Sequence, residues 1–486
     1  MTKTGAGLFL ALLTVNLGTT VSAQQPAFQI PPDERAFQLP PAIFRAQLAE
    51  TTTLIRAAEA RSNFHVTGAG IAVAVLDTGV LETHRDFLGR IVAKQNFVDP
   101  TAPIKDGNGH GTNVAGIVAA NGLHVGIAPG ADLVILKVLD DAGNGQLDWM
   151  IGALQWIVDH GQQYNVRVVN ISIGDRSNAK DDALFANDPI RRLIATLRAN
   201  KIAVVAAAGN EYHRFSPRGS PAAQGMAYPA IIRETVSVGA VYDAAVGGFD
   251  YQSGASVTTT KSDQLCVFSQ RLHETVNAVT RTDVFAPGAV LTSAGINWDD
   301  GESKMQGTSQ AAPVVAGTIA LMQEYYYHLA GSYASIDDIE AALHAGGDEV
   351  RDGDDQPDNV SHTGLVYNRV DVVRAIGALQ QQKSLAAYKE ALGIQRLPSA
   401  RVRADLLWSI GNTGNPDCPL QYPYPECIVP GRGRSCLMLK AVASAKANDC
   451  ANAFRLAVIT QCHNKQAQQG ILAAGTEPVC NFLRTQ

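Results

Sequence analysis

The chain has 486 residues, of which 46% are hydrophobic and 17% charged, and its formal net charge at pH 7 is −6. This length suggests two or three domains, and the composition is that of a globular protein and not of a disordered one. The negative charge argues against a general nucleic-acid-binding surface, and no apolar run beyond the N-terminus reaches the roughly 18 residues that a membrane span needs.

The first 23 residues have the pattern of an export signal. Lys3 supplies a positive charge, residues 7–15 (GLFLALLTV) form a short apolar core, and residues 21–23 (VSA) offer small side chains at a cleavage site. A membrane anchor is the alternative, but the apolar run is short and has no stop-transfer flank. We therefore expect cleavage after Ala23 and a secreted protein, either extracellular or periplasmic.

Residues 24–45 form an N-terminal extension rich in proline and glutamine, which is typical of an extended or mobile lead-in. A helical stretch is expected at about residues 46–60, followed by a break at residues 68–70 (GAG). Residues 243–264 are small and polar and predict a long surface loop.

Short β-branched runs alternate with helical segments from residue 71 onward. The expected strands are IAVAVLD (71–77), DLVILKVL (132–139), VRVVNISI (166–173) and IAVVAAAG (202–209). The clearest helix is 147–160, where apolar residues recur every three or four positions. This alternation predicts an α/β domain over residues 46–380, with a doubly wound, mostly parallel sheet and helices on both faces. Functional residues in such sheets gather at the carboxyl ends of the strands.

The C-terminal part of the chain differs from the rest. A helical connector is expected over residues 381–410 and a small, cysteine-rich, helical module over residues 411–486. Six of the seven cysteines lie in that module: Cys418, Cys427, Cys436, Cys450, Cys462 and Cys480. In an exported protein such a cluster predicts disulfides; zinc is the alternative, although no CxxC pair occurs. Cys266 is left over, and we expect a buried free thiol.

Three residues have the properties that nucleophilic catalysis by serine requires. A serine needs a base to take its proton, and the base needs a carboxylate to fix its tautomer. Asp77 ends an expected strand, His110 lies among glycines in DGNGHGTNVAGIVAA, and Ser309 opens an expected helix in GTSQAAPVVAGTIALM, with Pro313 in its first turn. Each has an ordinary alternative: a strand-end aspartate, a structural histidine and a helix N-cap.

Asn210 ends the strand before it and offers an amide to an oxyanion, although asparagine after glycine is also common in turns. The chain order Asp–His–Ser is one of the known orders of a catalytic triad.

Four blocks of the sequence resemble the signature blocks of the subtilisin-like serine proteases (subtilases, peptidase family S8). They are VAVLDTGV (73–80), GHGTNVAG (109–116), AAAGN (206–210) and GTSQAAP (307–313). The resemblance covers roughly residues 50–380. It implies that Asp77, His110 and Ser309 are the catalytic triad and that Asn210 and the Ser309 backbone N–H form the oxyanion hole. It also implies that Ser172, Ile173 and Gly174 form the edge that pairs with an extended substrate.

The sequence departs from the family pattern at a few positions. Asn113 stands where a second histidine is usual, and Gln310 stands where methionine is common. Asp175 follows the substrate-binding edge; it either favours substrates with basic side chains or simply faces solvent. The family's inhibitory pro-domain has little room here, because only about 25 residues separate Ala23 from the first expected helix.

No cofactor is expected, and no metal ligand is assigned. The family often binds structural calcium, but its ligands are not identified in this sequence. The segment DGDDQPD (352–358) offers oxygen ligands, although it fails the EF-hand pattern and is better explained as a solvated acidic loop.

The expected function is a secreted serine endopeptidase that acts on protein or peptide substrates through an acyl-enzyme. The alternatives are a catalytically idle binding or scaffold protein on the same fold and an acyl transferase, such as a peptide ligase or cyclase. The C-terminal module is expected either to attach or target the enzyme or to be a maturation segment removed after export.

Overall fold

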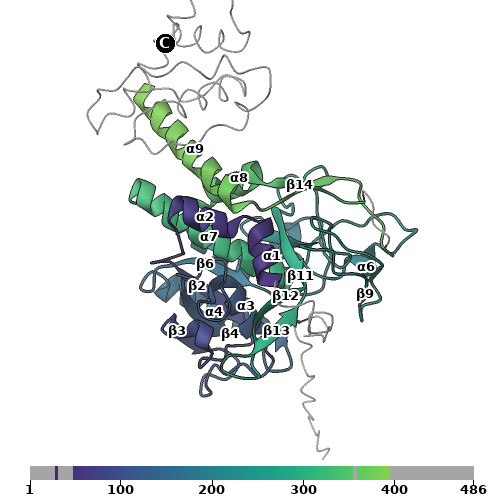
Figure 1. Ribbon diagram of the computed structural model, residues 1–486, viewed down its shortest axis with the longest axis horizontal. Coiled ribbons are helices and arrows are strands. Elements are labelled where there is room, and N and C mark those ends of the chain that lie inside the picture. The colour runs from purple at the N-terminus through teal and green to yellow at the C-terminus, as the bar shows by residue number, and fades with distance from the viewer. Residues whose placement is uncertain (1–27, 31–46, 354–357, 393–486) are drawn as a thin grey trace, which may run out of the picture.

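The computed structural model describes residues 28–30, 47–353 and 358–392 (Figure 1). The expected export signal, most of the N-terminal extension, most of the connector and the whole cysteine-rich module lie outside these residues. Within them, no helix is both long and apolar enough to cross a lipid bilayer.

A nine-stranded sheet forms the centre of the described part of the chain. In spatial order it contains β14 (Asp348–Arg351), β15 (Val366–Arg369), β11 (Val284–Ala289), β8 (Val236–Tyr242), β7 (Ala203–Ala207), β6 (Val166–Ile171), β2 (Ala72–Asp77), β4 (Asp132–Lys137) and β3 (Ile91–Asn96). Only β14 at one edge is antiparallel to its neighbour; every other neighbouring pair is parallel. The four predicted strands are β2, β4, β6 and β7, each within two residues of its expected ends.

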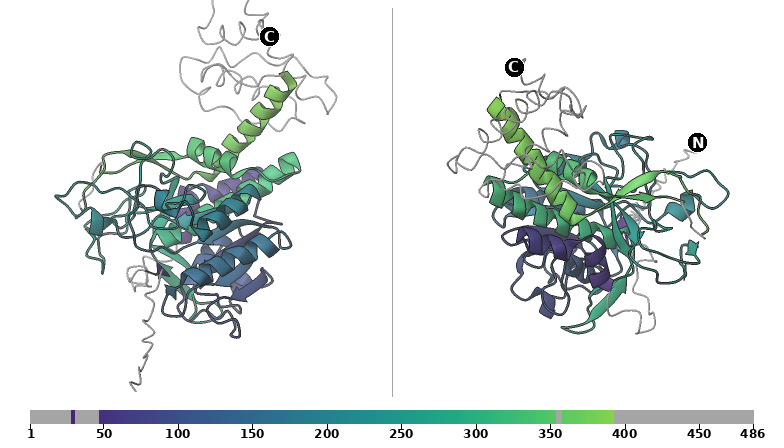
Figure 2. Two further views of the ribbon diagram at one scale, coloured as in Figure 1. Left: turned by 180° about the vertical axis from the view of Figure 1, so that it is seen from behind. Right: turned by 45° about the horizontal axis from the view of Figure 1, so that its top comes forward.

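Helices cover both faces of this sheet, as Figures 1 and 2 show. One face carries α2 (Ala57–Phe64), α3 (His110–Ala119), α7 (Thr308–Ala330), α8 (Ile336–Gly346) and α9 (Val372–Leu392), whose apolar residues belong to one hydrophobic cluster. The other face carries α4 (Leu147–His160) and α5 (Pro189–Ala199), which belong to a second cluster. The predicted α/β fold with a mainly parallel sheet is thus confirmed for this part of the chain.

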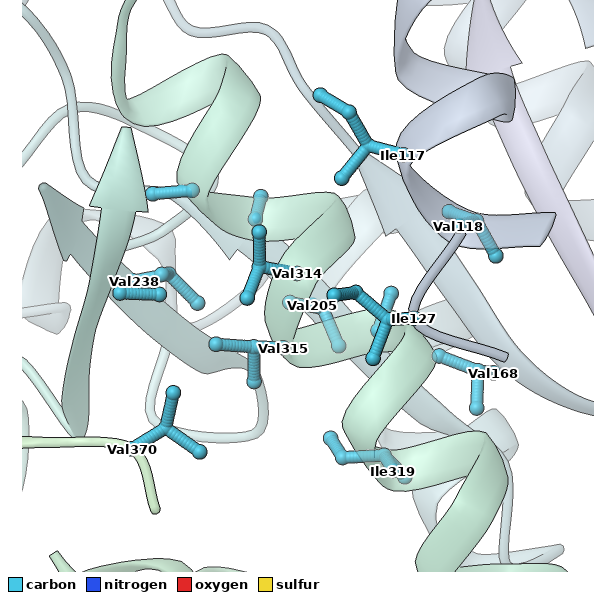
Figure 3. Packing of buried hydrophobic residues seen from close by; sticks show 14 of the residues in the cluster. Ile117, Val118, Ile127, Val168, Val205, Val238, Val314, Val315, Ile319 and Val370 are labelled. Atoms are coloured by element: carbon cyan, nitrogen blue, oxygen red, sulfur yellow. The ribbon is translucent and has the colours of Figure 1, made fainter. Parts of the chain in front are cut away.

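Alternation along β2 shows how one strand serves both clusters. Val73 and Val75 pack in the cluster of α3 and α7, whereas Ala72, Ala74 and Leu76 pack in the cluster of α4 and α5. All six residues of the strand are buried. Side chains along a strand point alternately to the two faces of the sheet, and here both of these sets pack into an apolar cluster; neither is a polar set that faces water. Figure 3 shows the first cluster around α7, with Val314, Val315 and Ile319 facing strand residues such as Val168, Val205 and Val238.

Two expectations about the fold are wrong in detail. The helix expected at 46–60 is two helices, α1 (Gln47–Leu54) and α2, because Arg56 between them adopts a left-handed backbone (φ 58°). The loop expected at 243–264 is not all at the surface: it contains the paired strands β9 (Phe249–Asp250) and β10 (Ser256–Val257), and Tyr251 is buried in the core. The Tyr251 hydroxyl lies 2.8 Å from that of Tyr242.

Other expectations agree with the structure. Helix α4 has the bounds expected for 147–160, and Cys266 is a buried free thiol whose pKa burial raises well above its ordinary value. Helix α9 crosses the boundary placed at residue 380 and includes the first residues of the expected connector.

Candidate active site

The order of the strands creates a switch point beside β2. The chain adds β4 and β3 on one side of β2 and then β6, β7 and β8 on the other. In open parallel sheets, ligands bind at the carboxyl ends of the strands where the winding reverses. Strand β2 ends at Asp77, and the neighbouring strand β6 is followed directly by Ser172.

Asp77 and His110 form a buried carboxylate–imidazole pair at this point. The Nδ1 atom of His110, the first residue of α3, lies 2.8 Å from Oδ1 and 3.0 Å from Oδ2 of Asp77. Both side chains are only 1% exposed. The Thr78 amide also donates to Oδ1 of Asp77, at 2.7 Å. A carboxylate held in this way fixes Nδ1 as the protonated nitrogen of the neutral ring, which leaves Nε2 as the basic one.

Asp106 organises the loop that leads into α3, and it was not predicted from the sequence. Its buried carboxylate accepts from the backbone amides of Asn108, Gly109 and Thr112 at 2.8–3.0 Å. It also accepts from the hydroxyls of Thr78 and Thr112. The carboxylate thereby caps the first turn of the helix that carries His110. An aspartate four residues before the histidine, followed by Gly-Asn-Gly, was the available sequence signal.

Ser309 is the second residue of α7 and is joined to Ser172 by two hydrogen bonds. The Ser309 hydroxyl donates to the Ser172 carbonyl at 2.9 Å, and the Ser172 hydroxyl donates to the Ser309 carbonyl at 2.6 Å. Pro313 is the sixth residue of α7, so its expected place in the first turn is wrong. Because proline has no N–H, it leaves the carbonyl of Ser309 open for Ser172.

Asn210 is oriented by the start of the same helix. Its side-chain oxygen accepts from both the backbone amide and the hydroxyl of Thr308, each at 2.9 Å. The Thr308 hydroxyl in turn accepts from the Gly209 amide at 3.1 Å. With the oxygen end fixed, the Nδ2 end of the amide has a defined direction. Asn210 and Ser309 line one small cavity together.

The predicted substrate-binding edge, Ser172 to Gly174, borders this cavity. Ile173 and Gly174 line it, and Gly174 is paired antiparallel with Gln29 of the N-terminal extension. Residues 28–30 of the expected lead-in therefore lie against the site, which composition alone did not indicate.

Asp175 does not line this cavity, so the suggested preference for basic side chains has no support from its position. Its carboxylate accepts from the backbone amides of Ser177 and Tyr228 at 3.0 and 2.9 Å. It shapes a turn instead of facing a substrate or simply facing solvent. The charged residues that line the cavity are Arg176 and Glu211, joined by a 2.5 Å ion pair. Neither was predicted from the sequence.

Asn113 and Gln310, which both depart from the family pattern, are in contact with each other. Nε2 of Gln310 lies 3.5 Å from Oδ1 of Asn113, and both side chains are buried. Nδ2 of Asn113 also donates to the Ser303 hydroxyl at 2.9 Å. The contact between Gln310 and Asn113 joins the first turns of α7 and α3, which carry Ser309 and His110.

The acidic segment at 352–358 is not a solvated loop at the two aspartates that the structure describes. Asp352 is fully buried and lies 2.7 Å from Nη1 of the equally buried Arg271. Asp358 is buried as well, and His362 bridges it to Asp352 at 3.1 and 3.0 Å. Burial alone would raise the pKa of Asp352, but Arg271, His362 and Thr363 lower it to about 2.

This donor set does not fit calcium, because a guanidinium and an imidazole already occupy the Asp352 carboxylate. In the part of the chain that the structure describes, no group of three or more His, Cys, Asp or Glu side chains is arranged to hold a metal ion. Asp354 and Asp355 lie outside that part.

Comparisons with known proteins show which family the chain resembles. A family model described as "Subtilase family" matches residues 68–344. The chain is 33% identical over 287 residues to the "Major intracellular serine protease" of Bacillus subtilis, which covers 57% of this chain and 76% of that protein. It is 32% identical to the "Intracellular serine protease" of Paenibacillus polymyxa over 53% of this chain and 68% of that protein. Subtilisin E of Bacillus subtilis is 33% identical over 53% of this chain and 56% of its own length.

Proposed function

Because the chain belongs to the subtilase family of serine proteases, we propose that it is a secreted serine endopeptidase in which Asp77, His110 and Ser309 form the catalytic triad. The observation that carries the proposal is the buried pair between Nδ1 of His110 and the carboxylate of Asp77. It lies at the switch point of the sheet, next to helix α7, whose second residue is Ser309.

In this mechanism His110 is the general base. Asp77 holds the imidazole so that Nε2 accepts the hydroxyl proton of Ser309, and it stabilises the imidazolium that results. Ser309 Oγ then forms a bond to the carbonyl carbon of the scissile peptide. The imidazolium returns the proton to the leaving amine, and an acyl-enzyme remains, which water hydrolyses by the same sequence of steps. The Ser309 hydroxyl must turn from the Ser172 carbonyl toward His110 for the first step.

The negative charge on the tetrahedral intermediate is stabilised by two donors, Nδ2 of Asn210 and the backbone N–H of Ser309. Thr308 supports this assignment, because it fixes the oxygen end of the Asn210 amide. The position of Ser309 in the first turn of α7 adds the positive end of a helix dipole.

The substrate backbone binds as an added strand along Ser172, Ile173 and Gly174. This edge follows the last paired residue of β6, so its backbone groups can pair with an extended peptide. The Ser172 side chain is committed to Ser309 and keeps the edge in register with the nucleophile.

The decisive experiment is labelling with a fluorophosphonate probe together with hydrolysis of a peptide library. We expect the wild-type protein to label and to cleave, and Ser309→Ala to do neither while keeping its thermal transition. In subtilisin, a member of this family, loss of the nucleophilic serine costs about 10⁶ in kcat. Ser253→Ala, at an exposed serine, is the matched control and should label normally. A folded Ser309→Ala protein that cleaves peptides would disprove the assignment, and a wild-type protein that never labels would favour the idle scaffold.

Secretion and the role of the cysteine-rich module are also proposals. Secretion is supported by the export pattern of residues 1–23, whereas two of the matched relatives are named as intracellular. N-terminal sequencing of protein recovered from the medium or periplasm should begin at Gln24; retention of the full length in the cytoplasm would contradict secretion.

We further propose that the cysteine-rich module is stabilised by disulfides and aids attachment or targeting. Non-reducing mass spectrometry that finds six free thiols would contradict the disulfides.

A further inference from the structure

Asn170 places a polar side chain inside an apolar part of the sheet. Its partners in register are Val75 of β2 and Val205 of β7, and both belong to the hydrophobic cluster around α7. Val168, two positions earlier and therefore on the same face of β6, belongs to this cluster as well (Figure 3). Asn170 itself is 0% exposed. Strand β6 thus has an amide at a position where packing alone favours an aliphatic side chain.

The amide of Asn170 is only half satisfied. Its Nδ2 group donates to the Ser172 hydroxyl at 2.8 Å, whereas its Oδ1 atom accepts no hydrogen bond from the residues that the structure describes. A buried polar atom without a partner lowers stability relative to an apolar side chain of similar shape. Stability therefore does not explain why asparagine stands here, and the bond from Nδ2 to Ser172 is the contact that sets asparagine apart from leucine.

The direction of this bond follows from the next one. The Ser172 hydroxyl lies 2.6 Å from the backbone carbonyl oxygen of Ser309, and a carbonyl oxygen can only accept. The single hydrogen of the hydroxyl is therefore used by Ser309, so the group that faces its lone pairs must be a donor. The amide nitrogen of Asn170 meets this requirement. The three groups form a chain of two hydrogen bonds, from Asn170 through Ser172 to Ser309.

The chain ends on a peptide group whose orientation matters for the proposed chemistry. Pro313 has no N–H to offer to the Ser309 carbonyl, so the Ser172 hydroxyl takes the place of the missing donor. The residue held in this way carries both the proposed nucleophile and the backbone N–H proposed for the oxyanion hole. Hydrogen bonds in a chain polarise one another, so the donation from Asn170 strengthens the bond from Ser172 to Ser309.

We propose that Asn170 is a positioning residue for Ser309. By donating to the Ser172 hydroxyl it directs the hydrogen of that hydroxyl at the Ser309 carbonyl, and it thereby fixes the start of α7 relative to the end of β6. Asn170 is buried within the strand, so it acts through Ser172 and not on the substrate. This inference rests on the proposed function, because it takes Ser309 to be the nucleophile.

The first variant to measure is Asn170→Leu in the full-length protein. Leucine has a similar branched shape but no donor, so the Ser172 hydroxyl is no longer directed. We expect kcat to fall about three- to tenfold, the range for one neutral hydrogen bond, with KM changed by less than about twofold. The thermal transition should stay where it is or rise, because the half-satisfied amide is gone. Asn170→Ala, which cannot overpack the site, should show the same loss in kcat.

Val168→Ala is the matched control, because it changes a buried side chain on the same face of the same strand. It should lower the thermal transition, since it leaves a cavity, and keep kcat within about twofold of the wild type. A residue that serves only the fold has this signature. Asn170→Leu is expected to show the opposite one, a lower kcat without a loss of stability.

A double-mutant cycle in kcat with Ser172→Ala tests the route of the effect. Without the Ser172 hydroxyl, Asn170 has no group through which to act, so Asn170→Leu in that background should change kcat by less than about twofold. The rate of fluorophosphonate labelling, which needs Ser309 but no peptide, should follow kcat in all four proteins.

An equal loss of kcat in both backgrounds would overturn the inference, and so would a normal kcat in folded Asn170→Leu or Asn170→Ala. Failure of both variants to fold would overturn it as well, because a structural role would then suffice. These outcomes leave the proposed function intact, since the wild type still labels and cleaves. If no form labels or cleaves, the proposed function has failed, and the role of Asn170 fails with it.

Discussion

Ser172 and Ser309 are joined by two hydrogen bonds that run in opposite directions, each from the hydroxyl of one residue to the backbone carbonyl of the other. The bond from Ser172 exists because Pro313, four residues after Ser309, has no N–H to donate within the helix. The proposed substrate-binding edge and the proposed nucleophile are thus held together through a carbonyl that the helix leaves open.

Replacing Ser172 by alanine should leave that carbonyl buried without its donor and lower the free energy of unfolding by about 1–3 kcal/mol. It should also lower kcat, because Ser309 loses one of its two links to the edge and keeps only the bond from its hydroxyl to the Ser172 backbone carbonyl. In the background of Ser172→Ala, the further change Pro313→Ala supplies an N–H to the Ser309 carbonyl and should recover part of the stability but not the activity. Chemical denaturation and peptide kinetics on the wild type, Ser172→Ala, Pro313→Ala and the double variant check this. If the effects of the two substitutions on stability simply add, the explanation is contradicted.

Asn210→Ala should lower kcat by roughly 10² to 10³ with little change in KM, because an oxyanion donor acts mainly in the transition state; this is the loss that removal of such a donor causes in subtilisin, a member of the family. Thr308→Val keeps the backbone amide but removes one of the two donors to the Asn210 oxygen, so a smaller loss in kcat is expected. Steady-state kinetics separate the two parameters, and an effect of Asn210→Ala on KM alone would mean that Asn210 only shapes the cavity.

Asn113→Ala and Gln310→Ala should each reduce kcat modestly, because their contact joins the first turns of the helices that carry His110 and Ser309. The two effects should not add: the coupling energy of one neutral hydrogen bond is about 0.5–1.5 kcal/mol. A double-mutant cycle in kcat/KM measures this coupling. Zero coupling would show that the two helices are positioned without this pair.

Asp352→Asn should destabilise the fold by about 3–5 kcal/mol, because it leaves the guanidinium of Arg271 buried without the carboxylate with which it forms an ion pair. Asp337→Asn is the control, since Asp337 pairs with Arg198 but is 84% exposed, and it should change stability by less than about 1 kcal/mol. Thermal or denaturant unfolding gives both values. Equal effects would mean that burial of the Arg271 pair does not matter.

Stability should fall as the pH rises from about 6.5 to 9. Hydrogen bonds to Asp352 and then to Asp358 raise the pKa of His362 to about 9 in the folded protein, from an ordinary value of 6.5. The folded state therefore binds this proton more tightly, and its contribution is complete below pH 6.5 and lost through pH 9. Because His362 is only partly buried, we expect a loss of about 1 kcal/mol. The pH dependence of the unfolding free energy should flatten in this range in His362→Gln.

The sequence determined the elements with the strongest local patterns. Unbroken β-branched runs predicted β2, β4, β6 and β7, because strands buried on both faces need apolar residues at every position. The three- and four-residue repeat predicted α4 to its end residues. The candidate catalytic residues were also found in the sequence. Each needs a local context, either a strand end or a helix start, and the neighbouring residues in the chain indicate that context.

Only the tertiary structure decided what lies beside these residues. The Asp175 carboxylate was expected near a substrate or in solvent, yet it binds the amides of Ser177 and Tyr228. The acidic segment was expected to be solvated from its composition, yet Asp352 is buried because Arg271, 81 positions away, supplies the opposite charge. Phe28 belongs to a proline-rich lead-in, and its burial depends on a groove formed by residues more than 100 positions later. Composition and periodicity report a residue's neighbours in the chain, whereas burial, charge pairing and strand pairing depend on partners that only folding brings close.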